Sequence, residues 1–179
     1  MYRFLLFLSI SVVLWSCKDS ARDEYLLEIS QMEQELDSML VIAEANRIDT
    51  LSKLIDHIKN RTLDVSKHYV PDTIDLEIAK MMNLYKDVRK AMSSNSGNLA
   101  KVKNSIPEGQ QKLADLRYDI ENGLGDREKY GEFVAFERAK VNQIEEILAY
   151  YLDVKQEFTD VFRETDPQVQ AFIRELKDE

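Results

Sequence analysis

The sequence predicts an all-α protein, an elongated helical bundle with a long antiparallel coiled-coil-like extension. Only 5 Gly and 3 Pro occur among 179 residues, which leaves few turns for a fold of many strands. Apolar residues recur every three or four positions along most of the chain, the spacing that places them on one face of a helix. Hydrophobic residues make up 44% and charged residues 32%, a balance typical of a folded chain.

The first helix is predicted from Asp19 to about Tyr69, a stretch without Gly or Pro. Its apolar face weakens around residues 45–47, where we expect a kink or a change of register. An unbroken helix of this length would reach ~70 Å. That is long for a globular domain, and it is the reason for predicting the coiled-coil-like extension.

Two middle helices follow. Pro71 ends the first helix, and Asp72 or Thr73 is expected to cap a second one that extends to about Met92. Residues 93–98, SSNSGN, predict a loop. Residues 105–108, SIPE, have the form of a capping box with Pro at an early helical position, so a third helix should begin there and end at the glycines of residues 122–125.

The fourth main helix is predicted from about Asp126 to Glu164. Its heptad positions form a packing seam in which eight of ten residues are apolar: Tyr130, Val134, Glu137, Val141, Ile144, Leu148, Tyr151, Lys155, Phe158 and Phe162. Pro167 is then expected to restart a short amphipathic helix. The fold should therefore contain about four main helices and a short C-terminal one.

The N-terminus predicts a secretory signal peptide at residues 1–16. Arg3 supplies a positive charge, and the following run from Phe4 to Trp15 carries none. This apolar run is shorter than the roughly 17 to 25 residues that span a bilayer as a helix. The order of basic tip, short apolar run and small residue is that of a signal peptide.

Residues 14–17, LWSC, resemble the lipobox of bacterial lipoproteins. The resemblance implies that Cys17 is acylated with palmitate-type chains and becomes the mature N-terminus, although Trp15 is larger than the residue usual at its position. Residues 17–24 would then be the lipidated N-terminus and a short tether, and residues 25–179 the helical bundle domain. Two or more acyl chains hold a protein stably on a membrane.

Lys18 and Asp19 partly resemble the surface-export signal of Bacteroidota-type lipoproteins. The resemblance implies a cell-envelope protein at the outer membrane, with the periplasmic and surface faces both open. Asp followed by Ser or Thr and an apolar residue also resembles the O-glycosylation acceptor of such exported proteins. It occurs with Ser20, Ser38, Thr50 and Thr73 as acceptors; helix capping and chance are the alternative explanations.

Several function classes are disfavoured by composition. The net charge of −9 and the absence of a basic stripe argue against nucleic-acid binding. His57 and His68 would lie ~16 Å apart on one helix, too far to share a metal, and Asp64 with His68 offers only half a site. Neither a phosphate-binding glycine loop nor a nucleophile elbow occurs. We therefore expect no catalytic residues, metal or cofactor, and no enzymatic activity.

The expected function is that of an envelope-anchored lipoprotein acting as a non-enzymatic helical interaction or scaffold module. Its partners would be the membrane, through the acyl chains, and a protein or a second copy bound through the long helices. The alternative is a lipoprotein whose bundle binds a small molecule in a pocket lined by aromatic residues of the fourth helix: Tyr130, Phe133, Phe136, Tyr150, Tyr151, Phe158 and Phe162.

Overall fold

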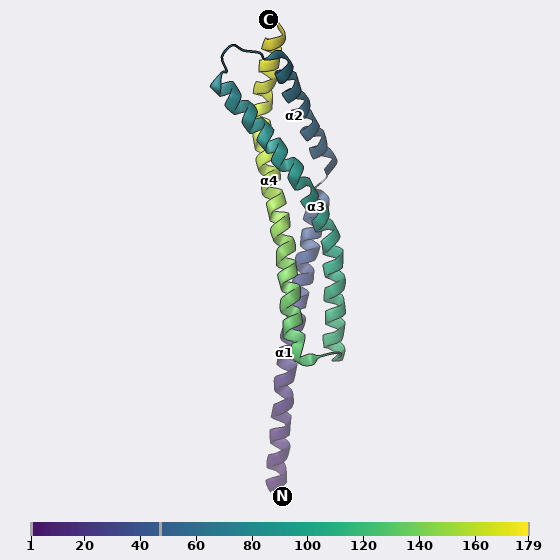
Figure 1. Ribbon diagram of the computed structural model, residues 1–179. Coiled ribbons are helices and arrows are strands. Elements are labelled where there is room, and N and C mark those ends of the chain that lie inside the picture. The colour runs from purple at the N-terminus through teal and green to yellow at the C-terminus, as the bar shows by residue number, and fades with distance from the viewer. Residues whose placement is uncertain (1, 47, 179) are drawn as a thin grey trace. The chain divides into compact units, whose positions relative to one another are not determined.

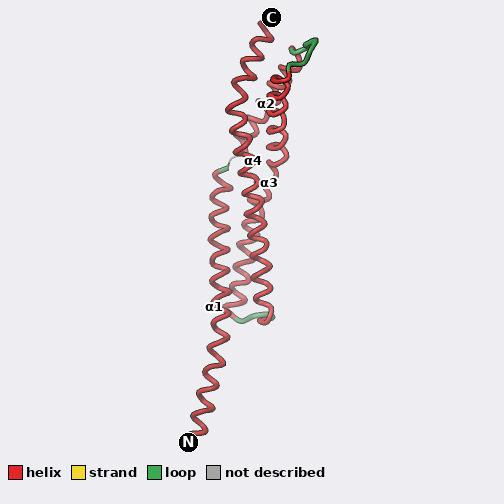
Figure 2. Tube along the Cα trace, turned by 90° about the vertical axis from the view of Figure 1, so that its left-hand side faces the viewer, coloured by secondary structure: helices red, strands yellow, loops and turns green. Residues whose placement is uncertain are grey.

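The computed structural model describes the backbone of residues 2–46 and 48–178 and the side chains of residues 21–46 and 51–178. All regular structure in these residues is helical, which confirms the all-α prediction (Figure 1). The elements are α1 (Tyr2–Ala45), α2 (Ile48–His68), α3 (Leu76–Asn122), a 3-10 turn η1 (Arg127–Lys129) and α4 (Tyr130–Asp178). Figure 2 shows that only short loops separate them.

The first predicted helix is two helices. α1 ends at Ala45 and α2 begins at Ile48, at the place where the apolar face weakens in the sequence. Asn46 lies between them; its backbone N–H donates to the Ala43 carbonyl at 3.3 Å, and its side-chain oxygen accepts a hydrogen bond from Lys155 at 2.5 Å. These two hydrogen bonds of Asn46 stabilise the interruption, which is a helix break and not a kink.

The predicted loop at residues 93–98 is wrong, because these residues are helical within α3. Asn95 is buried, and its amide donates to the backbone carbonyl of Tyr151 at 3.3 Å. The hydroxyl of Ser96 donates to the Ser93 carbonyl at 2.8 Å. The polar side chains are thus satisfied without leaving the helix, and tertiary packing overrides their local preference for loops.

The two predicted helix starts at prolines are also wrong. Pro107 lies inside α3 and Pro167 inside α4. A proline removes one backbone hydrogen bond, but buried residues flank both of them, Ile106 before Pro107 and Val169 after Pro167. The apolar face continues through each proline, and its packing stabilises the uninterrupted helix. The short C-terminal helix is consequently the last part of α4.

The cap of α3 is Asp75, not Asp72 or Thr73. Asp75 Oδ1 accepts hydrogen bonds from the backbone N–H groups of Glu77 at 2.8 Å and Ile78 at 3.2 Å. This carboxylate satisfies donors that the first turn of a helix leaves open. Residues 72–73 belong to the loop that joins α2 to α3.

The turn between α3 and α4 lies where the glycines predict it. α3 ends at Asn122, and both following glycines have left-handed backbone angles, with φ of 63° at Gly123 and 73° at Gly125. L side chains rarely adopt such angles, whereas glycine does so freely. The backbone N–H of Leu124 donates to the Asp119 carbonyl at 2.8 Å, which closes the helix end.

The chain forms two compact units. Unit 1 comprises Met1–Ile42 and Lys103–Glu145, and unit 2 comprises Ala43–Val102 and Glu146–Glu179. Unit 1 combines α1 with the end of α3 and the start of α4, which lie side by side in Figures 1 and 2. Unit 2 combines α2 with the start of α3 and the rest of α4. Each unit is therefore a bundle of three helical segments.

Each unit has its own apolar core, as expected when the apolar stripes of several helices face one another. The seam predicted on α4 is confirmed, since eight of its ten residues are buried and Lys155 and Phe162 are half-buried. The core of unit 1 includes Ile29, Met32, Leu36, Ile106, Leu113, Ile120, Val134 and Val141; that of unit 2 includes Ile58, Val65, Tyr85, Met92, Leu99, Leu148, Tyr151 and Phe158.

Candidate functional site

The most elaborate group of polar side chains in unit 2 is the Asp166 cluster, defined as His57, Arg61, Tyr85 and Asp166. His57 and Arg61 come from α2, four positions apart, a spacing that places them on the same helix face. Tyr85 comes from α3 and Asp166 from α4. The cluster therefore joins all three helical segments of the unit.

One carboxylate oxygen is the centre of the cluster. Asp166 Oδ1 lies 2.5 Å from the Tyr85 hydroxyl, 2.9 Å from Arg61 Nε and 3.0 Å from His57 Nε2. The Asp166 and Arg61 side chains are only 16% and 18% exposed, whereas His57 is 41% exposed. Charge-assisted hydrogen bonds in such partly buried surroundings are stronger than neutral ones.

The tautomer of His57 decides how two of these contacts are used. Arg61 Nε carries one hydrogen and lies 2.6 Å from His57 Nε2 as well as 2.9 Å from the carboxylate. With its hydrogen on Nε2, the imidazole donates to Asp166, and Arg61 then donates to Asp166 too. With the hydrogen on Nδ1, His57 Nε2 accepts from Arg61. Both tautomers leave Asp166 with at least one charged or hydroxyl donor.

Tyr85 is the buried donor of the cluster. Burial raises its pKa far above the ordinary value, and the hydrogen bond to Asp166 and the charge of that carboxylate raise the pKa further, against a lowering effect of Arg61. The phenol therefore keeps its proton throughout the physiological pH range. It acts as a hydrogen-bond donor rather than as a base or nucleophile.

Aromatic rings cover the cluster. The Phe162 ring meets His57 edge-on with centroids 5.8 Å apart, and it stacks on Tyr85 at 6.5 Å and on Phe158 at 6.4 Å. The Phe162 ring thus places apolar surface against His57 and Tyr85, and a less polar setting strengthens their electrostatic contacts. The arrangement fixes α2 onto α3 and α4.

The histidines do not form the metal half-site considered from the sequence. His68 Nδ1 lies 2.8 Å from the backbone carbonyl of Asp64, whereas the Asp64 carboxylate lies 3.5 Å from Lys177 Nζ. Within the described residues, no group of three His, Cys, Asp or Glu side chains is arranged to hold a metal ion. The carboxylate that contacts His57 belongs to Asp166, 109 positions away in the sequence. No sequence spacing indicates this pairing.

The predicted modification sites are described only in part. The side chains of Cys17, Lys18, Asp19, Ser20 and Thr50 lie outside the described residues. Ser38 is exposed on α1 in unit 1, with its hydroxyl donating to the Gln34 carbonyl at 2.9 Å. Thr73 is exposed in the loop between α2 and α3, in unit 2. In the described part of the chain, no helix is both long and apolar enough to cross a membrane.

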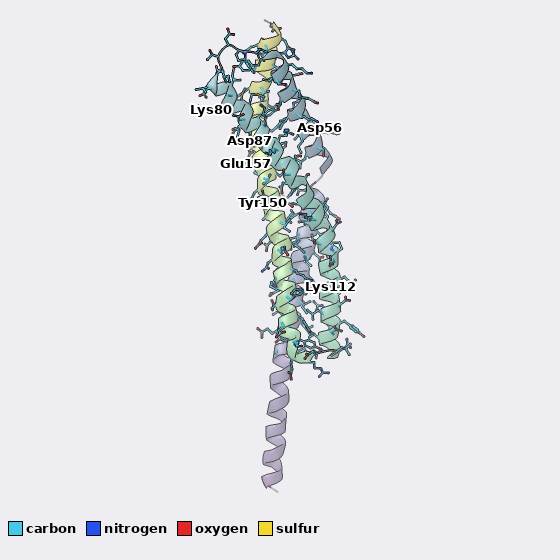
Figure 3. All side chains as sticks on the ribbon, viewed as in Figure 1. Asp56, Lys80, Asp87, Lys112, Tyr150 and Glu157 are labelled. Carbon is cyan, nitrogen blue, oxygen red and sulfur yellow. The ribbon has the colours of Figure 1, made fainter. Side chains whose placement is uncertain are left out.

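The aromatic residues of α4 divide into core and surface. Tyr130, Tyr151 and Phe158 are buried in the bundle. Phe133, Phe136 and Tyr150 are exposed, and Tyr150 is labelled in Figure 3. They therefore do not gather around one enclosed cavity.

An apolar surface lies at the loop between α2 and α3, and we call it the α2–α3 patch: Val70, Ile74 and Leu76. Their side chains are 86%, 65% and 72% exposed. A neighbouring surface depression of about 470 Å³ is lined by Ile78, Met81 and Leu84 among others. Single exposed apolar residues are normal, whereas several within one short segment make that segment a candidate interaction surface. The sequence did not predict this patch, because a helix capped at Asp72 or Thr73 would contain Ile74 and Leu76.

Comparison with known proteins does not assign this site. No protein-family model, curated protein or solved structure matches the chain.

Proposed function

We propose that this protein is an envelope-anchored lipoprotein whose helical bundle acts as a non-enzymatic interaction or scaffold module. The observation that carries the interaction part is the α2–α3 patch. Three large apolar side chains exposed in the α2–α3 loop and at the first residue of α3 cost solvation free energy unless a partner covers them. The partner would be a protein, or a second copy of this chain, that presents an apolar surface.

The anchor is supported by the resemblance of residues 14–17 to a lipobox and by the fact that Cys17 is the chain's single cysteine. Acylation of Cys17 would attach the protein to the membrane, and Lys18 and Asp19 would direct it to the outer membrane. Ser38 and Thr73 are exposed, as glycosylation would require.

The non-enzymatic part of the proposal is motivated by the way the Asp166 cluster uses its own groups. The Asp166 carboxylate is engaged by donors from α2 and α3, and Tyr85 holds its proton tightly. Tyr151 and Phe158 fill the core of unit 2. That favours the interaction module over the alternative of a small-molecule-binding bundle.

The anchor is tested by intact-protein mass spectrometry on the membrane fraction of the native host. We expect a chain that begins at Cys17 and is heavier by a set of acyl chains, and hexose-like increments would indicate glycosylation. Cys17→Ala should yield an unlipidated precursor. A chain that retains Met1, or one cut elsewhere without lipid, would refute the anchor.

The interaction module is tested by a photo-crosslinking amino acid placed at Val70, with Asp56 as the matched control. Asp56 is exposed on α2 in the same unit (Figure 3). We expect a defined adduct from position 70 that is absent from position 56 and is lost when Leu76→Glu is added. The same adducts from both positions would contradict a role for the patch.

A further inference from the structure

A polar surface depression lies in unit 1, at the turn between α3 and α4. A depression of about 550 Å³ is lined by Arg22 and Tyr25 of α1, Glu121 of α3, Arg127 and Glu128 of η1, and Tyr130 of α4, among others. We call it the turn pocket. It has no part in the Asp166 cluster or in the α2–α3 patch, both of which belong to unit 2.

Two guanidinium groups supply positive charge to the turn pocket. Arg22 Nη2 donates to the backbone carbonyl of Glu121 at 2.9 Å, and Arg127 Nε donates to that of Gly123 at 2.8 Å. Neither arginine forms an ion pair within the described residues. A guanidinium has five N–H donors, so most of the donors remain for a ligand. A Cβ at residue 123 would lie 2.3 Å from Arg127 Nη2, so Gly123 gives this side chain its place over the turn.

Two exposed carboxylates supply negative charge to the same pocket. Glu121 and Glu128 line it, and Glu121 Oε1 is 4.0 Å from Arg117 Nη1, too long for a strong hydrogen bond. The side chains of Tyr25 and Tyr130 add apolar surface. The lining therefore offers two cations, two anions and an apolar wall.

The surrounding charges select against a purely anionic ligand. Asp23, Glu24 and Asp119 neighbour lining residues in the sequence, and a surplus of negative charge on this part of the chain disfavours an anion. A ligand with both signs of charge avoids this penalty. Its phosphate can form charge-assisted, bidentate hydrogen bonds with a guanidinium, and its ammonium can pair with a carboxylate.

We propose that the turn pocket binds the zwitterionic head group of a membrane lipid, a phosphodiester joined to a primary ammonium as in phosphatidylethanolamine. The choice of a membrane lipid rests on the proposed anchor. Arg22 follows Cys17 by five residues, a distance of at most roughly 18 Å even for an extended chain. An acylated Cys17 thus keeps the pocket close to the lipid head groups.

Two exposed side chains near the turn suit contact with the same lipid surface. Tyr118 and Leu124 are exposed at the end of α3 and in the turn. Tyrosine is enriched where proteins meet the interface between lipid and water, because its ring is apolar and its hydroxyl is polar. These two side chains would contact the interface while the pocket holds a head group.

The pocket is tested by titrating the full chain in detergent micelles with glycerophosphoethanolamine, the soluble form of this head group, while NMR follows the arginine side chains. Arg127→Gln should weaken binding by about tenfold, the effect of losing one charge-assisted hydrogen bond. Lys129→Gln makes the same charge change in η1 but outside the pocket lining, and it should leave affinity unchanged. Equal losses in both variants, or no binding by the wild type, would overturn the proposal.

Two further binding measurements identify the ligand. Inorganic phosphate should bind more weakly than glycerophosphoethanolamine, and an equal affinity would make the pocket a simple anion site and overturn the proposal. Nanodiscs of phosphatidylethanolamine should shift the Arg127 signals more than nanodiscs of phosphatidylglycerol; no shift in either would overturn the assignment to a membrane lipid. The soluble titration does not depend on acylation, so an unacylated Cys17 combined with intact head-group binding would refute the anchor alone.

Discussion

Units 1 and 2 are both bundles of three helical segments, but they place their polar groups differently. In unit 1 the interhelical polar contacts lie toward the surface, as in the ion pair of Arg117 with Glu33 at 2.5 Å and that of Arg138 with Glu35. In unit 2 the Asp166 cluster is less exposed: Tyr85 is buried, and the Asp166 and Arg61 side chains are 16% and 18% exposed. Among the residues whose side chains are described, the buried polar ones are Asn46, Asn95 and Thr165 in unit 2 and Glu137 in unit 1.

This difference indicates that the two units fix their helix register by different means. Exposed ion pairs contribute little free energy, because water and salt screen them. A buried polar group left without its partner is costly, so it penalises every register that separates the pair. We infer that apolar packing determines register in unit 1, whereas polar pairing adds a second constraint in unit 2.

The largest expected effect tests what the units share. Leu113→Asp in unit 1 and Leu148→Asp in unit 2 each place a charge in an apolar core. Each should lower the free energy of unfolding by about 4 kcal/mol or more, measured by urea denaturation. The control, Phe136→Asp, changes an exposed residue and should have little effect. An unchanged denaturation midpoint for either core variant would contradict the core assigned to its unit.

Removing the Asp166 carboxylate from unit 2 should cost more stability than removing the Glu33 carboxylate from unit 1. Asp166→Ala removes the shared acceptor of Arg61 and Tyr85 and should cost about 3 kcal/mol, because buried donors then lack a partner. Glu33→Ala breaks the more exposed pair with Arg117 and should cost at most about 1 kcal/mol. Urea denaturation of both variants provides the comparison. Equal losses would remove the distinction between the units.

Alkaline pH should weaken unit 2 through Tyr85. Its pKa is raised in the folded protein, so the folded state holds a proton that the unfolded state releases above about pH 10. The contribution of Tyr85 to the free energy of unfolding is therefore fully present below that pH and is lost as the pH rises above it. Tyr85→Phe should cost about 1 to 2 kcal/mol at neutral pH and reduce the alkaline decline, as measured by denaturation between pH 7 and 11. A decline as steep as in the wild type would exclude Tyr85 as its source.

The smallest expected effect has the opposite sign. Tyr151 is fully buried, and its hydroxyl has no hydrogen-bond partner among the described residues. Burial also raises its pKa. Tyr151→Phe removes an unsatisfied polar group and should stabilise the protein by up to about 1 kcal/mol, seen as a higher melting temperature. A loss like that of Tyr85→Phe would indicate that a buried water binds the hydroxyl.

The sequence by itself determined the features that depend on local pattern. The helical class, the seam on α4 and the turn at Gly123 and Gly125 all follow from periodicity or from backbone conformations that favour glycine, whereas near residue 46 periodicity indicated an irregularity but not a helix break. Such signals extend over a few residues, so they survive without knowledge of the fold.

Only the tertiary structure showed which local signals for helix ends are overridden by packing and which distant residues come together. Residues 93–98 and both prolines look like helix ends, yet packing on each side keeps α3 and α4 continuous. The Asp166 cluster joins residues 81 and 109 positions apart, and the turn pocket joins Arg22 to Glu121 across 99. These contacts depend on how the helices lie against one another. That arrangement results from the sum of many apolar contacts, which no short stretch of sequence contains.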